Sequence, residues 1–163
     1  MHQKYTRSLI DLLNKPLRNW TKQLRGGFLI TLRRYSGAAM LGGIIYTFIE
    51  ILWRGYSHWS MTVLGGVCFA VLYFLYEKAG GAHLLLRCAA GSAFITAAEF
   101  LTGCIVNLRL GWNVWSYSSL RFNIFGQVSL FFSVLWFFLC ILGFKVCAIY
   151  RKAADFIDKQ IKQ

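Results

Sequence analysis

The chain has 163 residues, of which 57% are apolar and only 15% are charged, and its net charge is +12. An average soluble domain has about 25% charged residues, and a soluble domain of this size could not bury so much apolar surface. The same figures exclude a disordered chain, a collagen and a coiled coil. The basic excess would suit nucleic-acid binding, but no RNA-binding or helix-turn-helix motif accompanies it, so we expect no nucleic-acid partner. The composition predicts an all-α integral membrane protein.

The pattern of residues 1–34 predicts a basic amphipathic helix, which we expect to lie on the cytoplasmic leaflet. Leucines and aromatic residues recur at spacings of three and four, and basic residues recur with the same period on the opposite face. Each basic residue near an anionic surface contributes about 1 kcal/mol. Packing on a partner protein is the alternative for this helix. The residues that we expect to contact anionic lipids are Lys4, Arg7, Lys15, Arg18, Lys22 and Arg25.

Four apolar segments are each long enough to cross a membrane. They cover residues 37–53, 59–76, 84–106 and 128–149, within a transmembrane domain of residues 35–150. A helix needs about 20 residues to cross the hydrocarbon at about 1.5 Å per residue. The sequence therefore predicts a four-helix transmembrane bundle. Residues 151–163 predict a polar cytoplasmic helix that follows the last span.

Basic residues are distributed unequally between the two sides of these spans. Fifteen of the 18 lie before the first span, around the second connection or after the fourth span, and three lie in the other two connections. The positive-inside rule then places both termini in the cytoplasm of a bacterial cytoplasmic membrane. The opposite side carries an aromatic belt, whose interfacial anchors are Trp53, Trp59, Trp112, Trp115 and Tyr117.

Polar residues inside the predicted spans are the candidate functional residues. A charge at mid-membrane costs about 2.5–3.5 kcal/mol on insertion scales, so such residues face protein or water. Glu50 precedes Arg54 by four residues, and an i,i+4 pair at the membrane surface would account for both. Glu99 belongs to a stripe that we expect to face the bundle interior and that consists of Ser92, Thr96, Glu99, Gly103 and Asn107. The stripe favours either a substrate or ion contact in the outer half of the bundle or a buried structural hydrogen-bond network.

Residues 108–127 form an unusual connection between the third and fourth spans. Aromatic, basic and amide side chains alternate along it, and it is too short and polar to cross the membrane. We expect this segment to lie in the outer interface or to dip into the bundle, either as a surface belt or as a cover over a site. The predicted partners of the Glu99 carboxylate are Arg121, Asn123 and Gln127 from this segment, or Arg54 from the first span.

Motifs for catalysis and cofactor binding are missing from the sequence. It contains no P-loop, no dinucleotide-binding fingerprint and no HExxH motif. The three histidines are dispersed and the five cysteines form no CxxC pair. We therefore assign no catalytic residue, no metal ligand and no cofactor, and an enzyme is the less favoured class.

Three segments of the chain resemble a known family. They read IYTFIEILWRGYSHWSM at residues 45–61, EFLTGCIVN at 99–107 and WSYSSLRFNIFGQVSLFFSVLWF at 115–137. These segments are similar to the putative type IV ABC-transporter permease family of bacterial membrane proteins, over roughly residues 44–137. Ser116 stands where the family pattern has Asp, which weakens any role that this acid has in the family. The resemblance implies a small polytopic membrane protein that acts as a transport permease.

The sequence thus favours a transport-associated, permease-like subunit with an outward-facing polar site near Glu99. Four spans make a small bundle for a transporter, so a homo-oligomer, a separate ATPase or another membrane partner is implied. A non-transport protein is the main alternative, namely a lipid-binding or assembly factor that acts through the basic helix and residues 108–127. A less favoured alternative is an intramembrane enzyme that uses Glu99 as acid or base and Arg121 as an anion clamp.

Overall fold

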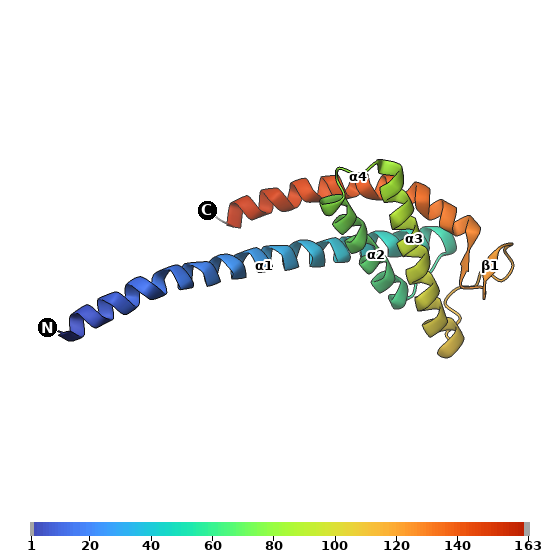
Figure 1. Cartoon of the computed structure of the whole chain (residues 1–163). Coiled ribbons are helices and arrows are strands. Elements are labelled where there is room, and N and C mark those ends of the chain that lie inside the picture. Colours follow the sequence, from blue (N-terminus) through green and yellow to red (C-terminus); the bar gives the residue numbers. More distant parts are fainter. Residues whose placement is uncertain (1, 162–163) are drawn as a thin grey trace. The chain divides into compact units, whose positions relative to one another are not determined.

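The computed structural model describes residues 2–161, with side chains from residue 26 onward. Its elements in chain order are α1 (His2–Arg54), α2 (Trp59–Lys78), α3 (Leu84–Gly103), η1 (Cys104–Arg109), β1 (Asn123–Ile124), β2 (Val128–Ser129) and α4 (Leu130–Ile161) (Figure 1). The segment η1 is a π-helix that follows α3 directly. The chain divides into two units, of which the first ends at Arg34 and the second begins at Tyr35.

Four helical segments are long and apolar enough to cross a membrane, which confirms the predicted all-α bundle of four spans. They are Gly26–Arg54, Trp59–Lys78, Leu84–Arg109 and Leu130–Ile161. The fourth helix begins at Leu130, two residues after the approximate start that the sequence predicts, because Val128 and Ser129 pair with β1 in a short antiparallel hairpin. The predicted C-terminal helix continues the fourth span, since α4 runs through residues 151–161 without a break.

The first unit is the N-terminal part of α1. Its apolar side chains include Phe28, Leu29 and Leu32, and its location at the membrane interface stays a prediction. The predicted anionic-lipid contacts lie outside the described side chains, and they stay a prediction: Lys4, Arg7, Lys15, Arg18, Lys22 and Arg25.

Helix α1 ends at a left-handed glycine, and α2 begins four residues later. Gly55 has φ +80°, and its N–H donates to the Ile51 carbonyl oxygen at 2.8 Å. This is the common way to end a helix, because glycine adopts positive φ at no steric cost. His58 then caps α2, since its Nδ1 atom accepts a hydrogen bond from the Ser60 N–H at 3.3 Å. The resulting turn places Ser57 beside the last turns of α1.

The part of α1 in the second unit packs very closely on α2. A Cβ atom added to Gly66 would lie 2.7 Å from the Ala39 carbonyl oxygen, and one added to Gly43 would lie 2.8 Å from the Thr62 carbonyl oxygen. The hydroxyls of Thr47 and Thr62 are 2.6 Å apart and hydrogen-bond across the same contact. Small residues permit this approach in membrane bundles, where helix association depends on van der Waals contact rather than on the hydrophobic effect.

Aromatic rings and small thiols fill the core of the second unit. Tyr73 is fully buried, and the rings of Tyr35 and Tyr150 meet it edge-on with centroids at 5.5 and 5.2 Å. Cys88, Cys140 and Cys147 are also buried, as free cysteines, and act there as small apolar packing groups.

Residues 110–129, here called the α3–α4 connection, have a tightly constrained backbone. Five of their residues have positive φ: Gly111, Asn113, Phe122, Phe125 and Gly126. Positive φ costs a non-glycine residue roughly 1–2 kcal/mol, so other contacts must hold this path. The side chain of Asn123 supplies two of them, donating to the Leu120 carbonyl at 2.7 Å and accepting from the Gly126 N–H at 2.9 Å. The connection between α3 and α4 therefore has a defined backbone conformation rather than that of a loose loop (Figure 1).

Candidate functional site

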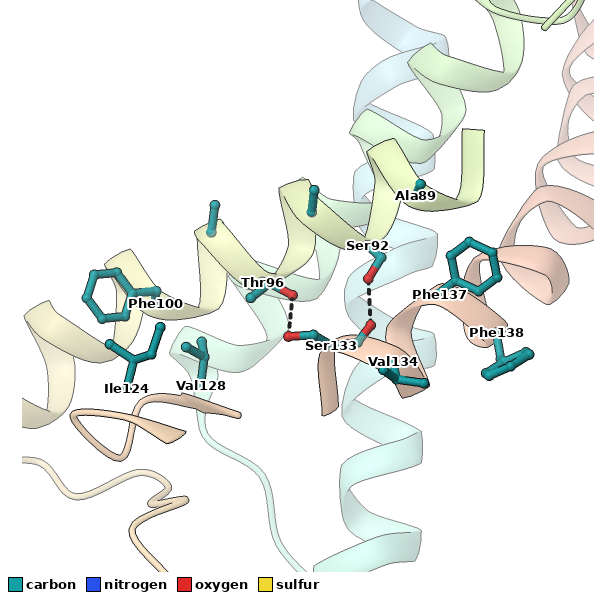
Figure 2. A pocket seen from close by; sticks show the side chains of 12 residues that line it. Ala89, Ser92, Thr96, Phe100, Ile124, Val128, Ser133, Val134, Phe137 and Phe138 are labelled. Atoms are coloured by element: carbon teal, nitrogen blue, oxygen red, sulfur yellow. Dashed lines mark hydrogen bonds between the residues drawn. The ribbon is translucent and has the colours of Figure 1, made fainter. Parts of the chain in front are cut away.

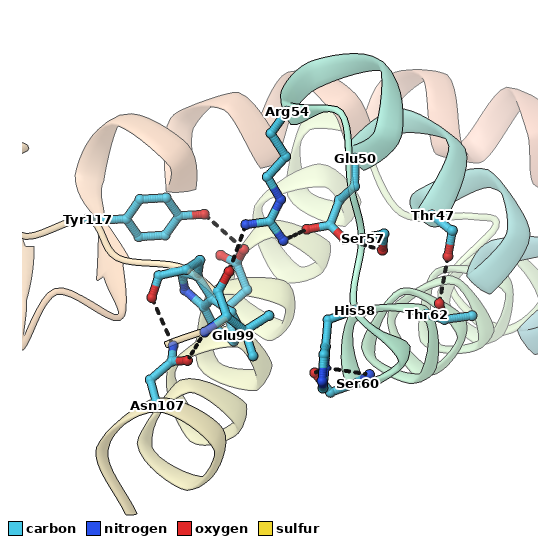
Figure 3. Close-up of polar contacts among 12 residues, drawn as sticks. Thr47, Glu50, Arg54, Ser57, His58, Ser60, Thr62, Glu99, Asn107 and Tyr117 are labelled. Atoms are coloured by element: carbon cyan, nitrogen blue, oxygen red, sulfur yellow. Dashed lines mark hydrogen bonds and ion pairs between the residues drawn. The ribbon is translucent and has the colours of Figure 1, made fainter. Parts of the chain in front are cut away.

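Glu99 on α3 is the most deeply buried carboxylate among the described side chains, with 2% of its surface exposed. The hydroxyl of Tyr117 donates to its Oε1 atom at 3.5 Å (Figure 3). Trp136 of α4 donates its indole N–H to Oε2 at 2.8 Å. A carboxylate has about four acceptor positions, and these two donors use only half of them.

The predicted inward orientation of Glu99 is correct, but its predicted partners are wrong. Its carboxylate makes no hydrogen bond with Arg121, Asn123, Gln127 or Arg54. Arg121 is exposed, and the amide of Asn123 is used within the turn of the connection. Arg54 is bound at the end of α1 instead. The carboxylate of Glu99 therefore points toward Trp136 of α4 and toward Tyr117 of the connection.

Glu50 and Arg54 form the predicted i,i+4 ion pair at the end of α1, next to the site (Figure 3). The Ser57 hydroxyl donates to the same Glu50 carboxylate. Arg54 also donates from Nη1 to the Val114 carbonyl oxygen at 2.9 Å. The ion pair thus has a second function, because it ties the end of α1 to the α3–α4 connection.

Asn107 attaches the connection to the end of the third span. Its amide donates to the Trp115 carbonyl at 3.0 Å and to Gln127 Oε1 at 2.8 Å, and its Oδ1 atom accepts from the Val114 N–H at 2.7 Å. Asn107 lies in the π-helix η1, and single π turns within helices are frequent at functional sites. Three hydrogen bonds from one buried amide therefore hold the connection against the end of the third span.

Trp115 is not the interfacial anchor that the sequence predicts. Only 7% of its surface is exposed, and its indole N–H donates to the Gln127 carbonyl at 2.9 Å. The ring is buried because its polar edge finds a partner within the connection, which a buried indole needs. Trp53, Trp59 and Trp112 are exposed, so their role as anchors stays a prediction.

Tyr117 is also drawn inward rather than left in a surface belt. Its ring stacks on Phe132 of α4 with centroids 4.5 Å apart, and its hydroxyl reaches Glu99. Burial raises the pKa of Tyr117, and the negative charge of Glu99 raises it further. The phenol therefore stays protonated at neutral pH and acts as a hydrogen-bond donor.

Ser92 and Thr96, the N-terminal half of the predicted stripe, join α3 to α4 instead of lining the site (Figure 2). The Ser92 hydroxyl donates to the Ser133 carbonyl at 2.6 Å, and the Thr96 hydroxyl donates to the Ser133 hydroxyl at 3.0 Å. They lie at the edge of an apolar groove of about 710 Å³ between these two helices. Their geometry supports a structural hydrogen-bond network, which is the second of the two readings of the stripe.

A second cavity, of about 300 Å³, lies between α1, α2, α3 and α4 and includes Glu99 in its wall. Its only other side chains with N–H or O–H groups are Tyr46 and Trp136, whose rings lie 6.0 Å apart. Glu99 is the only charged residue of this wall. The remaining wall is apolar and consists of Gly42, Ile45, Ile49, Leu64, Gly65, Cys68, Phe69, Leu72, Ile95, Leu139, Cys140, Leu142, Gly143 and Val146.

Within the described part of the chain, no cluster of three or more His, Cys, Asp or Glu residues could hold a metal ion. Arg121 also makes no hydrogen bond with Glu99, so the geometry gives no support to a carboxylate and anion clamp acting together. The arrangement offers one carboxylate, two aromatic donors and an apolar cavity. Such a set suits binding of a small molecule more than acid–base catalysis.

Tyr46 and Trp136 were not among the site residues that the sequence predicts. Each nevertheless has a recognisable signal, because Tyr46 precedes Glu50 by one helical turn and Trp136 follows Ser133 by three residues. Both therefore share a helix face with a polar residue of a predicted span. An aromatic residue with a polar edge on such a face is a candidate partner for a buried carboxylate.

The fold and the site define a multi-pass membrane protein in which a buried carboxylate, Glu99, lies near the α3–α4 connection. The family model described as "Putative ABC-transporter type IV" matches residues 54–163. The chain belongs to this family, and the match includes the connection and both donors of Glu99. No curated protein and no solved structure matches the chain at a significant level.

Proposed function

We propose that the protein is a permease-like subunit of a transport system, with an outward-facing polar site at Glu99 beneath the α3–α4 connection. The observation that carries this proposal is the burial of Glu99 beside a cavity within four apolar helices. An ionisable residue inside a membrane bundle is costly, and such residues commonly mark a substrate or ion path. Membership of a transporter family supports the same class.

The α3–α4 connection acts in this proposal as a cover that opens and closes. Its polar attachments to the helices include the bond from Arg54 to Val114 and those from Asn107 to Val114, Trp115 and Gln127, and the ring of Tyr117 adds an apolar contact with Phe132. A net hydrogen bond contributes about 0.5–1.5 kcal/mol, so a small number of them can be exchanged for water on the microsecond to second timescale of lid opening. Opening would expose Glu99 to the outer side.

A separate ATPase partner follows from the same proposal. The chain carries no P-loop motif, so ATP-driven transport needs a second protein that supplies it. Four spans also make a small bundle, so a homo-oligomer or a second membrane subunit completes the pathway.

The test is gentle purification of the full chain from its native membrane, followed by identification of the proteins that co-purify. We expect a stoichiometric ATPase, and we expect Glu99→Gln to keep this association while the transport activity of the assembly is lost. The matched control is Glu77→Gln, which changes a carboxylate that pairs with Arg151 elsewhere in the bundle. Repeated isolation of the chain without any ATPase contradicts the proposal.

A lipid-binding or assembly factor is the second candidate, and one observation favours it. The β1–β2 hairpin and the residue before it present three exposed apolar side chains, with Phe122 at 78%, Ile124 at 55% and Phe125 at 75% exposure. Such an apolar surface suits insertion into a leaflet or contact with another protein. Co-purification of lipid or of a non-ATPase membrane protein in the same experiment would favour this candidate.

A further inference from the structure

The cavity beside Glu99 has a chemical composition that selects its occupant. Its wall contains one carboxylate, two aromatic residues with polar edges and an otherwise apolar surface. No basic residue lines it. Its volume of about 300 Å³ is at the lower end of the range of small-molecule sites, roughly 300–1,000 Å³.

The Glu99 carboxylate has unused capacity toward this cavity. Trp136 donates a hydrogen bond to one carboxylate oxygen and Tyr117 donates one to the other, and both donors are neutral. A buried carboxylate with neutral donors lacks the charge compensation that Arg54 gives to Glu50. A cation that entered the cavity would supply this missing positive charge.

The aromatic residues favour an organic cation over a metal ion. The rings of Tyr46 and Trp136 lie 6.0 Å apart beside the carboxylate, and aromatic faces attract ammonium groups. The described residues offer no cluster of metal ligands. An ammonium group can use the carboxylate and the rings together without further oxygen ligands.

The rest of the wall indicates an alkyl chain on this cation. Away from Glu99 the cavity follows α4 toward Val146 and is lined by aliphatic and small residues. At its rim, Ile49 of α1 and Leu142 of α4 are 47% and 55% exposed, so the cavity reaches the surface of the helices that faces lipid. An amphiphile can enter from that side with its apolar part in contact with hydrocarbon.

We propose that this cavity binds a singly charged alkylammonium ion, with its ammonium group at Glu99 between Tyr46 and Trp136 and its alkyl chain along α4. Since no basic residue lines the cavity, a phosphate-bearing lipid amine is not accommodated, and the ligand is an amine without phosphate. This inference rests on the proposed function, for which it names the substrate class.

The test measures binding of hexylammonium to the full chain in nanodiscs of phosphatidylcholine, with empty nanodiscs as background. Hexan-1-ol and hexanoate are probes of the same chain length with neutral and negative head groups. We expect saturable binding of hexylammonium, at least about tenfold tighter than that of either other probe. Equal binding of hexan-1-ol, or displacement of hexylammonium by phosphatidylethanolamine in the nanodisc, overturns the proposal.

Variants assign the binding to the cavity. Glu99→Gln should weaken hexylammonium binding about tenfold or more, to the level of hexan-1-ol, whereas the matched variant Glu77→Gln should bind as the unchanged chain does. Ile45→Phe narrows the cavity from α1 and leaves the carboxylate in place, so it also should weaken binding. Unchanged binding in Ile45→Phe overturns the proposal even where Glu99→Gln fails to fold.

The two proposals can fail separately, because binding to the purified chain needs no partner. If an ATPase co-purifies and hexylammonium does not bind, only the ligand class is wrong. If hexylammonium binds at Glu99 and no ATPase is found, the ligand class stands and the transport partner is wrong.

Discussion

Two carboxylates near the same end of the bundle are stabilised in different ways. Glu50 lies at the end of α1 and has a charged partner, Arg54, and a hydroxyl donor, Ser57. Glu99 lies deeper and has only neutral donors from Tyr117 and Trp136. A neutral donor compensates less of the desolvation cost of a carboxylate than an ion pair does. Glu50 is thus satisfied as a structural group, whereas Glu99 retains the capacity to bind a ligand.

Trp136→Phe should lower the stability of the protein. The change keeps an aromatic ring in the core but removes the one hydrogen bond that the described residues make to Glu99 Oε2, so a buried acceptor is left unpaired at a cost of about 1–3 kcal/mol. Thermal unfolding in detergent measures the effect. Trp53→Phe is the matched control, because Trp53 is 80% exposed and its replacement should change stability by less than about 0.5 kcal/mol. Equal effects of the two variants would contradict this assignment.

At the scale of elements, the π-helix η1 and the α3–α4 connection behave as one structure. The connection has no long regular segment of its own, and its shape depends on the amides of Asn107 and Asn123. Gly103, at the end of α3, lies directly beneath it. A Cβ atom there would lie 2.6 Å from Gln127 Oε1 and 3.1 Å from Trp115 Cζ2. The close seat of the connection on α3 therefore requires a residue without a side chain.

Gly103→Ala should displace the connection and destabilise the protein by about 1–3 kcal/mol, as overpacking of a buried contact does. Amide hydrogen exchange should report faster exchange at residues 114–117, together with a lower melting temperature. Gly81→Ala is the control, because nothing lies within 4 Å of an added Cβ atom at that position. If the two alanine variants melted alike, the tight contact at Gly103 would not exist in solution.

The N-terminal helix should bind membranes on its own. A peptide of residues 3–32 should bind vesicles that contain anionic lipid and should bind neutral vesicles much more weakly, because its basic face attracts negative head groups. Added salt should weaken the binding, since charges at a surface are screened over about 10 Å at 0.1 M. Vesicle co-sedimentation over a salt series measures this. Binding that does not change with salt would show that the basic face is not the cause.

On the scale of the whole molecule, a membrane explains a surface that water would not tolerate. Large apolar side chains such as Phe48, Leu101 and Phe138 are more than half exposed on the helices of the second unit. In water, patches of this kind cause association, whereas in lipid they are solvated. The four apolar helices long enough to cross a membrane are consistent with this environment.

Topology is the prediction at this scale. Both termini should be cytoplasmic and the α3–α4 connection should lie outside, because 15 of 18 basic residues fall on one side of the spans. Ser119→Cys should react with a membrane-impermeant maleimide in intact cells, since Ser119 is exposed. Gly81→Cys, in the connection between α2 and α3, should react only after the cells are permeabilised. The reverse pattern would show that the orientation is inverted, and the unchanged chain gives the background from its native cysteines.

Local periodicity determined much of this protein in advance. The four spans, the Glu50–Arg54 pair and the inward face of Glu99 follow from helix length and from i,i+3 and i,i+4 spacing, which depend only on nearby residues. Only the tertiary structure decided which groups meet Glu99, because Tyr117 and Trp136 are 18 and 37 residues away along the chain. Those contacts depend on the rotation of α4 about its axis and on the path of the connection. Neither is encoded in a repeat, since the first is set by packing between helices and the second by the side-chain hydrogen bonds of Asn107 and Asn123.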